Sequence, residues 1–251
     1  MEHGARELLL AAEHAAVAAW PALESADVQG WLWRYAAGGS LRANSAATLA
    51  FTGDDCATAI LRVEELYGHK SAPCRFTISD VSVPRDLDQR LAVRGYVRGI
   101  PHVTLAKPAA SAPLPADVEF AQHPSPQWLE VYLAGLSEDR REVAPRILAR
   151  LPPNRTFIAC RRGGRVISSG LCVWESRAGL TLASVQCMAT TPAARRQGGA
   201  LAVLHAIEAY AHRREASHLY LQAEAANAGA LALYRRAGFA LAGHYHVRFK
   251  P

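Results

Sequence analysis

Two short stretches near the carboxyl end of this chain combine residue types that can bind an anion and donate a proton. In the first, Arg195 and Arg196 precede Gly198 and Gly199. Guanidinium groups bind phosphate well, and glycine lets the backbone approach a ligand closely. A strand-like run precedes these residues and apolar residues at helical spacing follow them, so we expect the free N–H groups of a helix start to attract an anion. A basic surface turn explains this stretch alone equally well.

The second stretch carries an amide and a phenol at helical spacing. Asn227 stands where a helix N-cap is favoured, and Gly238 where a left-handed residue ends a helix. Asn227 and Tyr234 are seven residues apart, so two helical turns would place them on one face. The amide can bind an amide-rich chain and the phenol can donate a proton. A cap residue and a core aromatic would explain this stretch alone better.

Together, the two stretches resemble the GNAT superfamily of acyl-CoA-dependent N-acyltransferases, over roughly residues 155–248. The family motifs are [Q/R]-x-x-G-x-[G/A] after a strand, then an Asn and a Tyr on a later helix before Gly-Phe. The residues that match them are Arg195, Gly198, Ala200, Asn227, Tyr234, Gly238 and Phe239. The resemblance implies an α/β (α+β) fold, with a mixed, mostly antiparallel sheet flanked by helices.

The resemblance also implies an activity, the transfer of an acetyl group from acetyl-CoA to a primary amine by direct attack. Tyr234 would be the general acid that protonates the departing thiolate, and a backbone N–H at or near Met188 would stabilise the oxyanion. The residues implied to bind acetyl-CoA are Met188, Ala189, Thr190, Arg195, Arg196, Gln197, Gly198, Gly199, Ala200, Asn227 and Tyr234. The sequence does not indicate whether acyl donors other than acetyl-CoA are used.

The general base is less clear, because the position where many relatives carry a strand Glu is Gln186. Glu224, at the end of the next strand, is our candidate, although a solvated strand-end carboxylate explains it equally well. His205 and Cys187 are expected to be structural. A non-catalytic acyl-CoA-binding or regulatory module is the alternative function, and the retained Tyr234 favours the enzyme.

The chain also predicts an internal repeat. A shift of 143 residues places Gly95 on Gly238 and Phe76 on Leu219, with the same order of elements. We therefore expect two tandem GNAT-like copies, residues 1–110 and 116–251, although an accidental likeness between α/β units is the alternative. The first copy lacks the chemistry, since its residues at the family positions are Pro84, Leu91 and the acidic pair Asp54 and Asp55.

Periodicity and turn residues outline the elements that must position these groups. Helices are expected over residues 7–20, 54–66, 84–93 and 127–151, with Pro145 splitting the last or starting a second helix. Strands are expected over residues 31–35, 74–79, 97–105, 156–160, 166–174, 182–189, 218–224 and 244–249. The Pro-rich residues 107–119 are the expected linker. Trp31, Trp33, Arg42 and Asn44 are candidates for an acceptor cleft between the copies, although strand aromatics usually belong to the core.

Composition limits the remaining function classes. The chain has 251 residues, half of them hydrophobic and a fifth charged, which is typical of a soluble globular protein. The net charge of +6 suits an anionic cofactor, and no Lys/Arg stripe interleaved with aromatics predicts nucleic-acid binding. The five cysteines are scattered, which predicts a protein of the reducing cytoplasm without a metal site. The sequence has neither an apolar run long enough for a membrane span nor the basic leader of a signal peptide, so neither is expected. The acceptor, a small-molecule or peptide amine, is unspecified, and a homodimer is left open.

Overall fold

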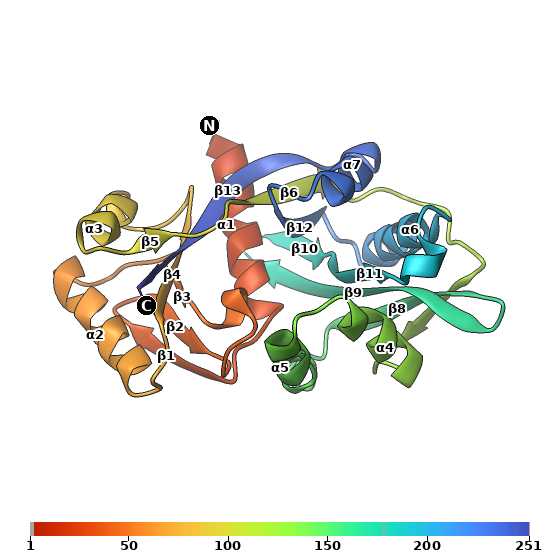
Figure 1. Ribbon diagram of the computed structural model, residues 1–251. Helices are drawn as coiled ribbons and strands as arrows, with labels where there is room; N and C mark the ends of the chain where they lie inside the picture. Colours follow the sequence, from red (N-terminus) through yellow and green to blue (C-terminus); the bar gives the residue numbers. More distant parts are fainter. Residues whose placement is uncertain (1–2, 178, 251) are drawn as a thin grey trace.

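The computed structural model describes residues 3–177 and 179–250, and its strands form one mixed sheet with helices on both faces (Figure 1). The strands of the first half are β1 Glu24–Val28, β2 Trp31–Tyr35, β3 Ala46–Ala47, β4 Cys74–Ser79, β5 Val97–Arg98 and β6 His102–Pro108. Those of the second half are β7 Val118–Ala121, β8 Arg155–Arg162, β9 Arg165–Arg177, β10 Leu180–Ser184, β11 Gln186–Thr190, β12 His218–Glu224 and β13 Ala240–Lys250. Most neighbouring pairs are antiparallel, which confirms the expected mixed sheet.

The α-helices follow the expected amphipathic stretches. They are α1 His3–Ala18, α2 Cys56–Gly68, α3 Leu87–Val93, α4 Pro126–Ala134, α5 Glu138–Leu148, α6 Gly199–Arg213 and α7 Ala228–Arg236. Cys56 starts α2 and Gly199 starts α6, 143 residues later. The strands that follow these two helices, β4 and β12, lead into the short helices α3 and α7. The order of elements is therefore repeated, as the tandem prediction requires.

The sheet order shows how the two copies are joined. It runs β1-β2-β3-β4-β13-β6-β12-β10-β9-β8-β7, so β13 lies between β4 and β6, and β6 lies between β13 and β12. Figure 1 shows β13, in dark blue, running from beside α7 to the strands of the first half. Each copy therefore receives its partner's last strand. The boundaries 1–110 and 116–251 remain a proposal about sequence segments, and the two segments share one sheet.

Helices on the two faces of the second half form separate cores. Side chains of α6 and α7 pack on one face, against Leu219 and Leu221 of β12. On the opposite face α1 packs against Tyr220, and α4 and α5 pack against β8 and β9. Successive residues of a strand point to opposite faces, so Gln222 and Glu224 lie on the α1 face.

Three expected elements are divided differently in the structure, and one of them is the strand 182–189, which is two strands, β10 and β11, separated at Val185. The break in the helical region 127–151 falls at Gly135, before the N-cap residue Ser137, whereas Pro145 lies inside α5. Ser137 has an extended backbone conformation with ψ 161°, so the helical backbone is interrupted there before the chain reaches Pro145. The expected strand 97–105 is interrupted around Gly99, where β13 accepts a hydrogen bond from the Gly99 N–H through Val247. The short strands β1, β3 and β7 were not predicted.

Candidate functional site

A gap opens in the sheet where β10 and β12 separate. These strands pair in parallel up to Ser184 and Tyr220, and the Val185 N–H donates the last bond to the Tyr220 carbonyl at 2.9 Å. Beyond this point β11 pairs with β9, while the end of β12 pairs with β6. The two strands therefore diverge, as in the letter V.

A β-bulge lies on the β11 side of this gap. Gln186 is paired with Leu171, and Ala189 with Ser169, so two residues of β11 oppose the single residue Gly170. The bulge includes Cys187, whose φ is 51°. A bulge removes residues from the ladder and redirects their backbone groups. Met188, predicted from sequence as the oxyanion donor, is the other residue of this bulge, and Ala189 and Thr190 follow it on the strand.

The predicted anion-binding loop connects β11 to α6. Gly198 is the N-cap of α6 with φ 82°, and a Cβ built on it would meet nothing within 4 Å. This position therefore needs glycine for its backbone conformation and has open space in front of it. Arg195 and Arg196 are exposed and have no ion pair in residues 3–177 and 179–250. The Gln197 side chain donates to the Ala193 carbonyl at 3.0 Å and so holds the loop.

The matching loop of the first copy is different. The carboxylate of Asp55 accepts hydrogen bonds from the N–H groups of Ala57 and Thr58 at the start of α2. The end of β3 is bonded to the loop after β4, through the Val83 N–H and the Thr48 carbonyl at 2.8 Å. The first helix terminus is therefore capped by the protein's own anion, and its neighbouring strands are closed by the chain itself.

Tyr234 is fixed by the end of α7. The N–H of Phe239 bonds to the Tyr234 carbonyl and that of Gly238 to the Arg235 carbonyl, both at 3.0 Å, and Gly238 has φ 87°. This is a Schellman ending, in which the residues at its two ends also touch. The Tyr234 and Phe239 rings lie 6.0 Å apart. Lys107 of β6 bonds the Ala237 carbonyl at 2.9 Å and supports the same turn.

The hydroxyl of Tyr234 has no hydrogen-bond partner within the described part of the chain. Its side chain belongs to the core cluster of α6 and α7, and Met188 packs against the same cluster. Burial raises the pKa of Tyr234 to about 12, so the phenol is protonated at neutral pH. Asn227 is exposed and uses its side-chain oxygen to cap α7 through the Ala230 N–H at 3.1 Å.

Other sequence-predicted residues lie on the α1 face of the sheet. Gln186 is buried, and its amide is bonded to Ser184, Ala19 and Arg42. Glu224 is exposed, and its carboxylate makes no hydrogen bond or ion pair with the described residues. It lies across the sheet from Tyr234.

A small cavity lies on this face at the base of the gap. Its lining includes Glu13 of α1, Arg34, Arg42, Gln222 of β12 and Tyr245 of β13. The space open to a water-sized molecule is about 30 Å³. Glu13 was not predicted from the sequence to line a site. The available signal was a carboxylate within the apolar helical stripe of residues 8–19, which must be buried if that stripe packs on the sheet.

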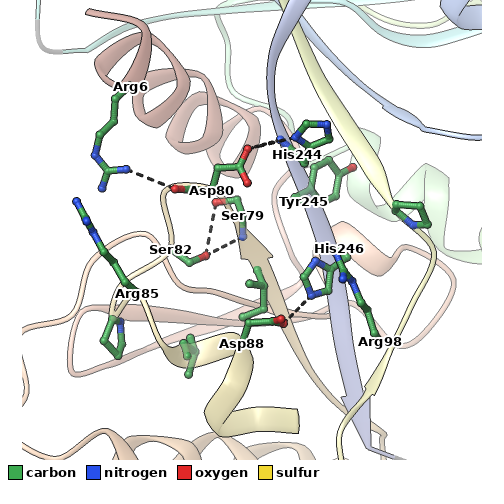
Figure 2. Close-up of a pocket in the computed structure, with 14 residues that line it drawn as sticks. Arg6, Ser79, Asp80, Ser82, Arg85, Asp88, Arg98, His244, Tyr245 and His246 are labelled. Carbon is green, nitrogen blue, oxygen red and sulfur yellow. Dashed lines mark hydrogen bonds and ion pairs between the residues drawn. The ribbon is translucent and has the colours of Figure 1, made fainter. Parts of the chain in front are cut away.

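A larger pocket, of about 680 Å³, shares Tyr245 with this cavity. Figure 2 shows Arg6 of α1 directed toward Asp80, Asp80 beside His244, and Asp88 beneath His246. Hydrogen bonds from Arg248 and His246 hold the pKa of Asp88 at about 2. Asp88 is therefore paired with Arg248, and the Asp80 carboxylate accepts a hydrogen bond from the His244 backbone N–H at 2.8 Å.

Two of the cleft candidates are core residues. Trp31 and Trp33 are buried, and Asn44 bonds the Ala36 N–H and the carbonyls of Gly38 and Ser40. Arg42 alone of the four candidates lines the cavity. The described residues contain no cluster of three metal-ligating side chains, and none of the described helices is long and apolar enough to span a bilayer.

Comparisons with known proteins agree with this geometry. Residues 9–250 match the family described as probable histone acetyltransferase Rv0428c C-terminal. The uncharacterized N-acetyltransferase YobR of Bacillus subtilis is 27% identical over 247 residues, which cover 95% of this chain and 97% of YobR.

Solved structures with the same fold include a GCN5-related N-acetyltransferase from Kribbella flavida. Its TM-score is 0.70 at 15% identity, covering 100% of this chain and 97% of that one. A tandem GNAT protein from the clavulanic acid biosynthesis pathway matches with a TM-score of 0.62 at 13% identity, covering 82% and 74%. These matches confirm the GNAT fold and its tandem arrangement.

Proposed function

Because the chain belongs to the acetyltransferase family described as probable histone acetyltransferase Rv0428c C-terminal, we propose that it transfers an acetyl group from acetyl-CoA to a primary amine. The observation that carries this proposal is the gap between β11 and β12, which lies beside a helix start capped only by Gly198. A thioester threaded through such a gap can be reached from both faces of the sheet.

The groups beside the gap fit the diphosphate of acetyl-CoA. The first N–H groups of α6 have no partners within the helix and carry partial positive charge. Gly198 leaves open space in front of them, and Arg195 and Arg196 add cations that make no ion pair with any described residue. Met188, Ala189 and Thr190 line the strand that leads from the gap to this loop, and we assign them to the pantetheine arm.

Tyr234 is the proposed general acid. Its hydroxyl has no hydrogen-bond partner among the residues that the structure describes, and it is protonated at neutral pH, so it is available to donate a proton to the departing thiolate. The backbone N–H of Met188, released from the ladder by the bulge, is the proposed donor to the oxyanion. Asn227 remains a proposed cofactor contact, and Glu224 remains a candidate base from the sequence.

We place the acceptor on the α1 face, in the pocket of Figure 2 and the cavity behind it. The first half of the chain supplies most of this lining. Arg85 and Arg98 line the pocket without an ion pair in the described part of the chain, whereas Asp88 is paired with Arg248 and Asp80 accepts a hydrogen bond from the His244 backbone N–H. This charge balance favours an acceptor that carries a carboxylate or phosphate besides its amine, and it disfavours a lysine-rich peptide.

Release of free thiol from acetyl-CoA, measured over a panel of amines, tests this function. The panel should contain amino acids, amino sugar phosphates, polyamines and a lysine-rich histone-tail peptide. We expect turnover with at least one acceptor, and its loss in Gly198→Asp. Binding of acetyl-CoA without turnover against any amine would contradict the proposed reaction, and preference for the histone-tail peptide would contradict the proposed acceptor class.

A further inference from the structure

Glu13 is a buried carboxylate at the base of the gap. Only 3% of the residue is exposed. Its Oε1 accepts a hydrogen bond from the Thr104 hydroxyl at 2.5 Å, and the Gln222 amide donates to Oε1 at 3.2 Å and to Oε2 at 3.1 Å. A carboxylate has about four acceptor positions, and these bonds hold its orientation without filling them. The side chain is therefore fixed by β6 and β12 while it lines the cavity.

Gln222 of β12 lines the cavity beside Glu13, and Arg42, which also lines it, is bonded to Gln186 of β11. Gln222 follows Tyr220 by two residues on β12, just beyond the last bond to β10. On the other side, Gln186 begins β11 and accepts a bond from Arg42 at 3.4 Å. Glu13 and Arg42 both line the cavity between them. On the α1 face, Glu13 is therefore one hydrogen bond away from Gln222, the residue of β12 that lies just beyond the point where the strands separate.

We propose that Glu13 is the general base of the reaction, taking a proton from the acceptor nitrogen directly or through one water in the cavity. This inference rests on the proposed function. The cavity's 30 Å³ exceeds the roughly 10–15 Å³ that one water requires, and Glu13, Gln222 and Arg42 would give that water polar partners. Glu13 thus takes the role that Gln186, an amide, cannot perform.

The proton balance is complete without a further reagent. The neutral amine attacks the thioester carbonyl and forms the C–N bond, and one nitrogen proton passes to the Glu13 carboxylate. The C–S bond then breaks, and the thiolate takes a proton from Tyr234. Proton return from Glu13 to Tyr234 through solvent restores both residues, so the products are the amide and free thiol.

The surroundings of Glu13 suit a base that works near neutrality. The pKa of Glu13 is raised from 4.5 to about 6 as the net result of several effects. Burial is the largest and raises it, the hydrogen bonds from Thr104 and Gln222 lower it, and the charges of Asp80 and Arg42 raise and lower it respectively. Arg34 and Tyr245 face the same cavity. The carboxylate is therefore mostly ionised at pH 7 and accepts a proton more readily than an ordinary Glu.

Glu13→Gln tests the proposal, with Glu142→Gln, on the exposed surface of α5, as the matched control. Both changes remove one carboxylate and keep the side-chain length. We expect Glu13→Gln to lower kcat/KM at pH 7 by roughly 10²–10⁴-fold, and Glu142→Gln to lower it by less than about threefold. With an acceptor amine of low pKa, the wild-type rate should fall as the pH drops through about 6, where Glu13 becomes protonated. The pH–rate profile of Glu13→Gln should lack this fall at acid pH.

A second variant keeps the test valid if Glu13→Gln folds poorly. Thr104→Val removes a hydrogen bond that lowers the Glu13 pKa and leaves the carboxylate in place. The pKa of Glu13 should therefore rise in this variant, and the fall in rate at acid pH should begin at a higher pH than in the wild type. A purely structural role of Glu13 would not cause this shift. A wild-type rate in Glu13→Gln, or an acid limb that Thr104→Val does not move, would overturn the proposal. Absence of turnover in the wild type would instead contradict the proposed function.

Discussion

Ser168 of β9 and Gly199 of α6 are in such close contact that a Cβ on Gly199 would lie 2.5 Å from the Ser168 Oγ. Ser168 also shares a hydrogen bond of 2.9 Å with the hydroxyl of Thr190, at the end of β11. The start of α6 is therefore held against β9, at the point where β9 is bonded to the end of β11. The two adjacent glycines have different roles, because Gly199 permits this contact and Gly198 faces open space.

Gly199→Ala is expected to destabilise the fold. The added methyl group would displace Ser168 or move the start of α6, and overpacking of this kind costs about 1–3 kcal/mol of unfolding free energy. Chemical denaturation measures this loss. In a Ser168→Ala background the Oγ atom is gone, and the nearest remaining atoms are Ile167 Cδ1 at 3.1 Å and the Cβ of residue 168 at 3.4 Å. The same change should therefore cost less. Equal costs in both backgrounds would contradict the contact.

Gly198→Asp is expected to weaken acetyl-CoA binding by about 10–100-fold, or about 1.4–2.8 kcal/mol. The new carboxylate would stand in the open space before the α6 terminus and repel the diphosphate. Gly198→Asn is the matched control, because Asn also tolerates a positive φ and brings no charge. Calorimetry should rank the affinities wild type, Asn, then Asp. Unchanged affinity in a folded Asp variant would remove the loop from the cofactor site.

Tyr234→Phe is expected to lower kcat by roughly 10²–10⁴-fold and to leave the affinity for acetyl-CoA nearly unchanged. The ring keeps its packing on Phe239, while the proton donor is lost. Since burial raises the phenol pKa to about 12, the wild-type profile should show no loss of activity from phenol ionisation below about pH 10. Turnover close to wild type in the Phe variant would mean that water supplies the proton.

Only the second half is expected to bind acetyl-CoA. In the first half, the Asp55 carboxylate already accepts hydrogen bonds from the N–H groups at the start of α2. The Val83 N–H donates to the Thr48 carbonyl and so links the end of β3 to the loop after β4. Calorimetry should therefore give one bound acetyl-CoA per chain, and Asp55→Ala should not create a second site. A stoichiometry of two in the wild-type protein would contradict this expectation.

Local patterns predicted much of this architecture. The β4 strand has the expected bounds, Cys74–Ser79, because its alternating side chains follow the sheet period. Asn227 and Gly238 lie at the expected ends of α7, since capping depends on a few neighbouring residues. The loop before α6 was equally predictable, because strand, glycines and helix follow one another in the chain.

Contacts between distant segments could not be predicted in the same way. Nothing local indicates that Gln222 will meet Glu13, 209 residues earlier in the chain. The bulge at Cys187 and Met188 depends on the partner strand β9, and the placement of β13 beside β4 depends on the whole sheet. These long-range contacts build the α1 face of the site, so the proposed base was missed while the cofactor loop was identified.

The exchange of β6 and β13 gives this single chain the layout of a two-fold symmetric dimer whose subunits have traded their final strands. In such a dimer every substitution appears twice, and a change that reshapes one subunit for the acceptor also alters the catalytic subunit. Joining the two copies in one chain removes this constraint. Asp55 can cap α2 while Gly198 leaves α6 open, so one copy is free to specialise in shaping the acceptor site that the other copy uses.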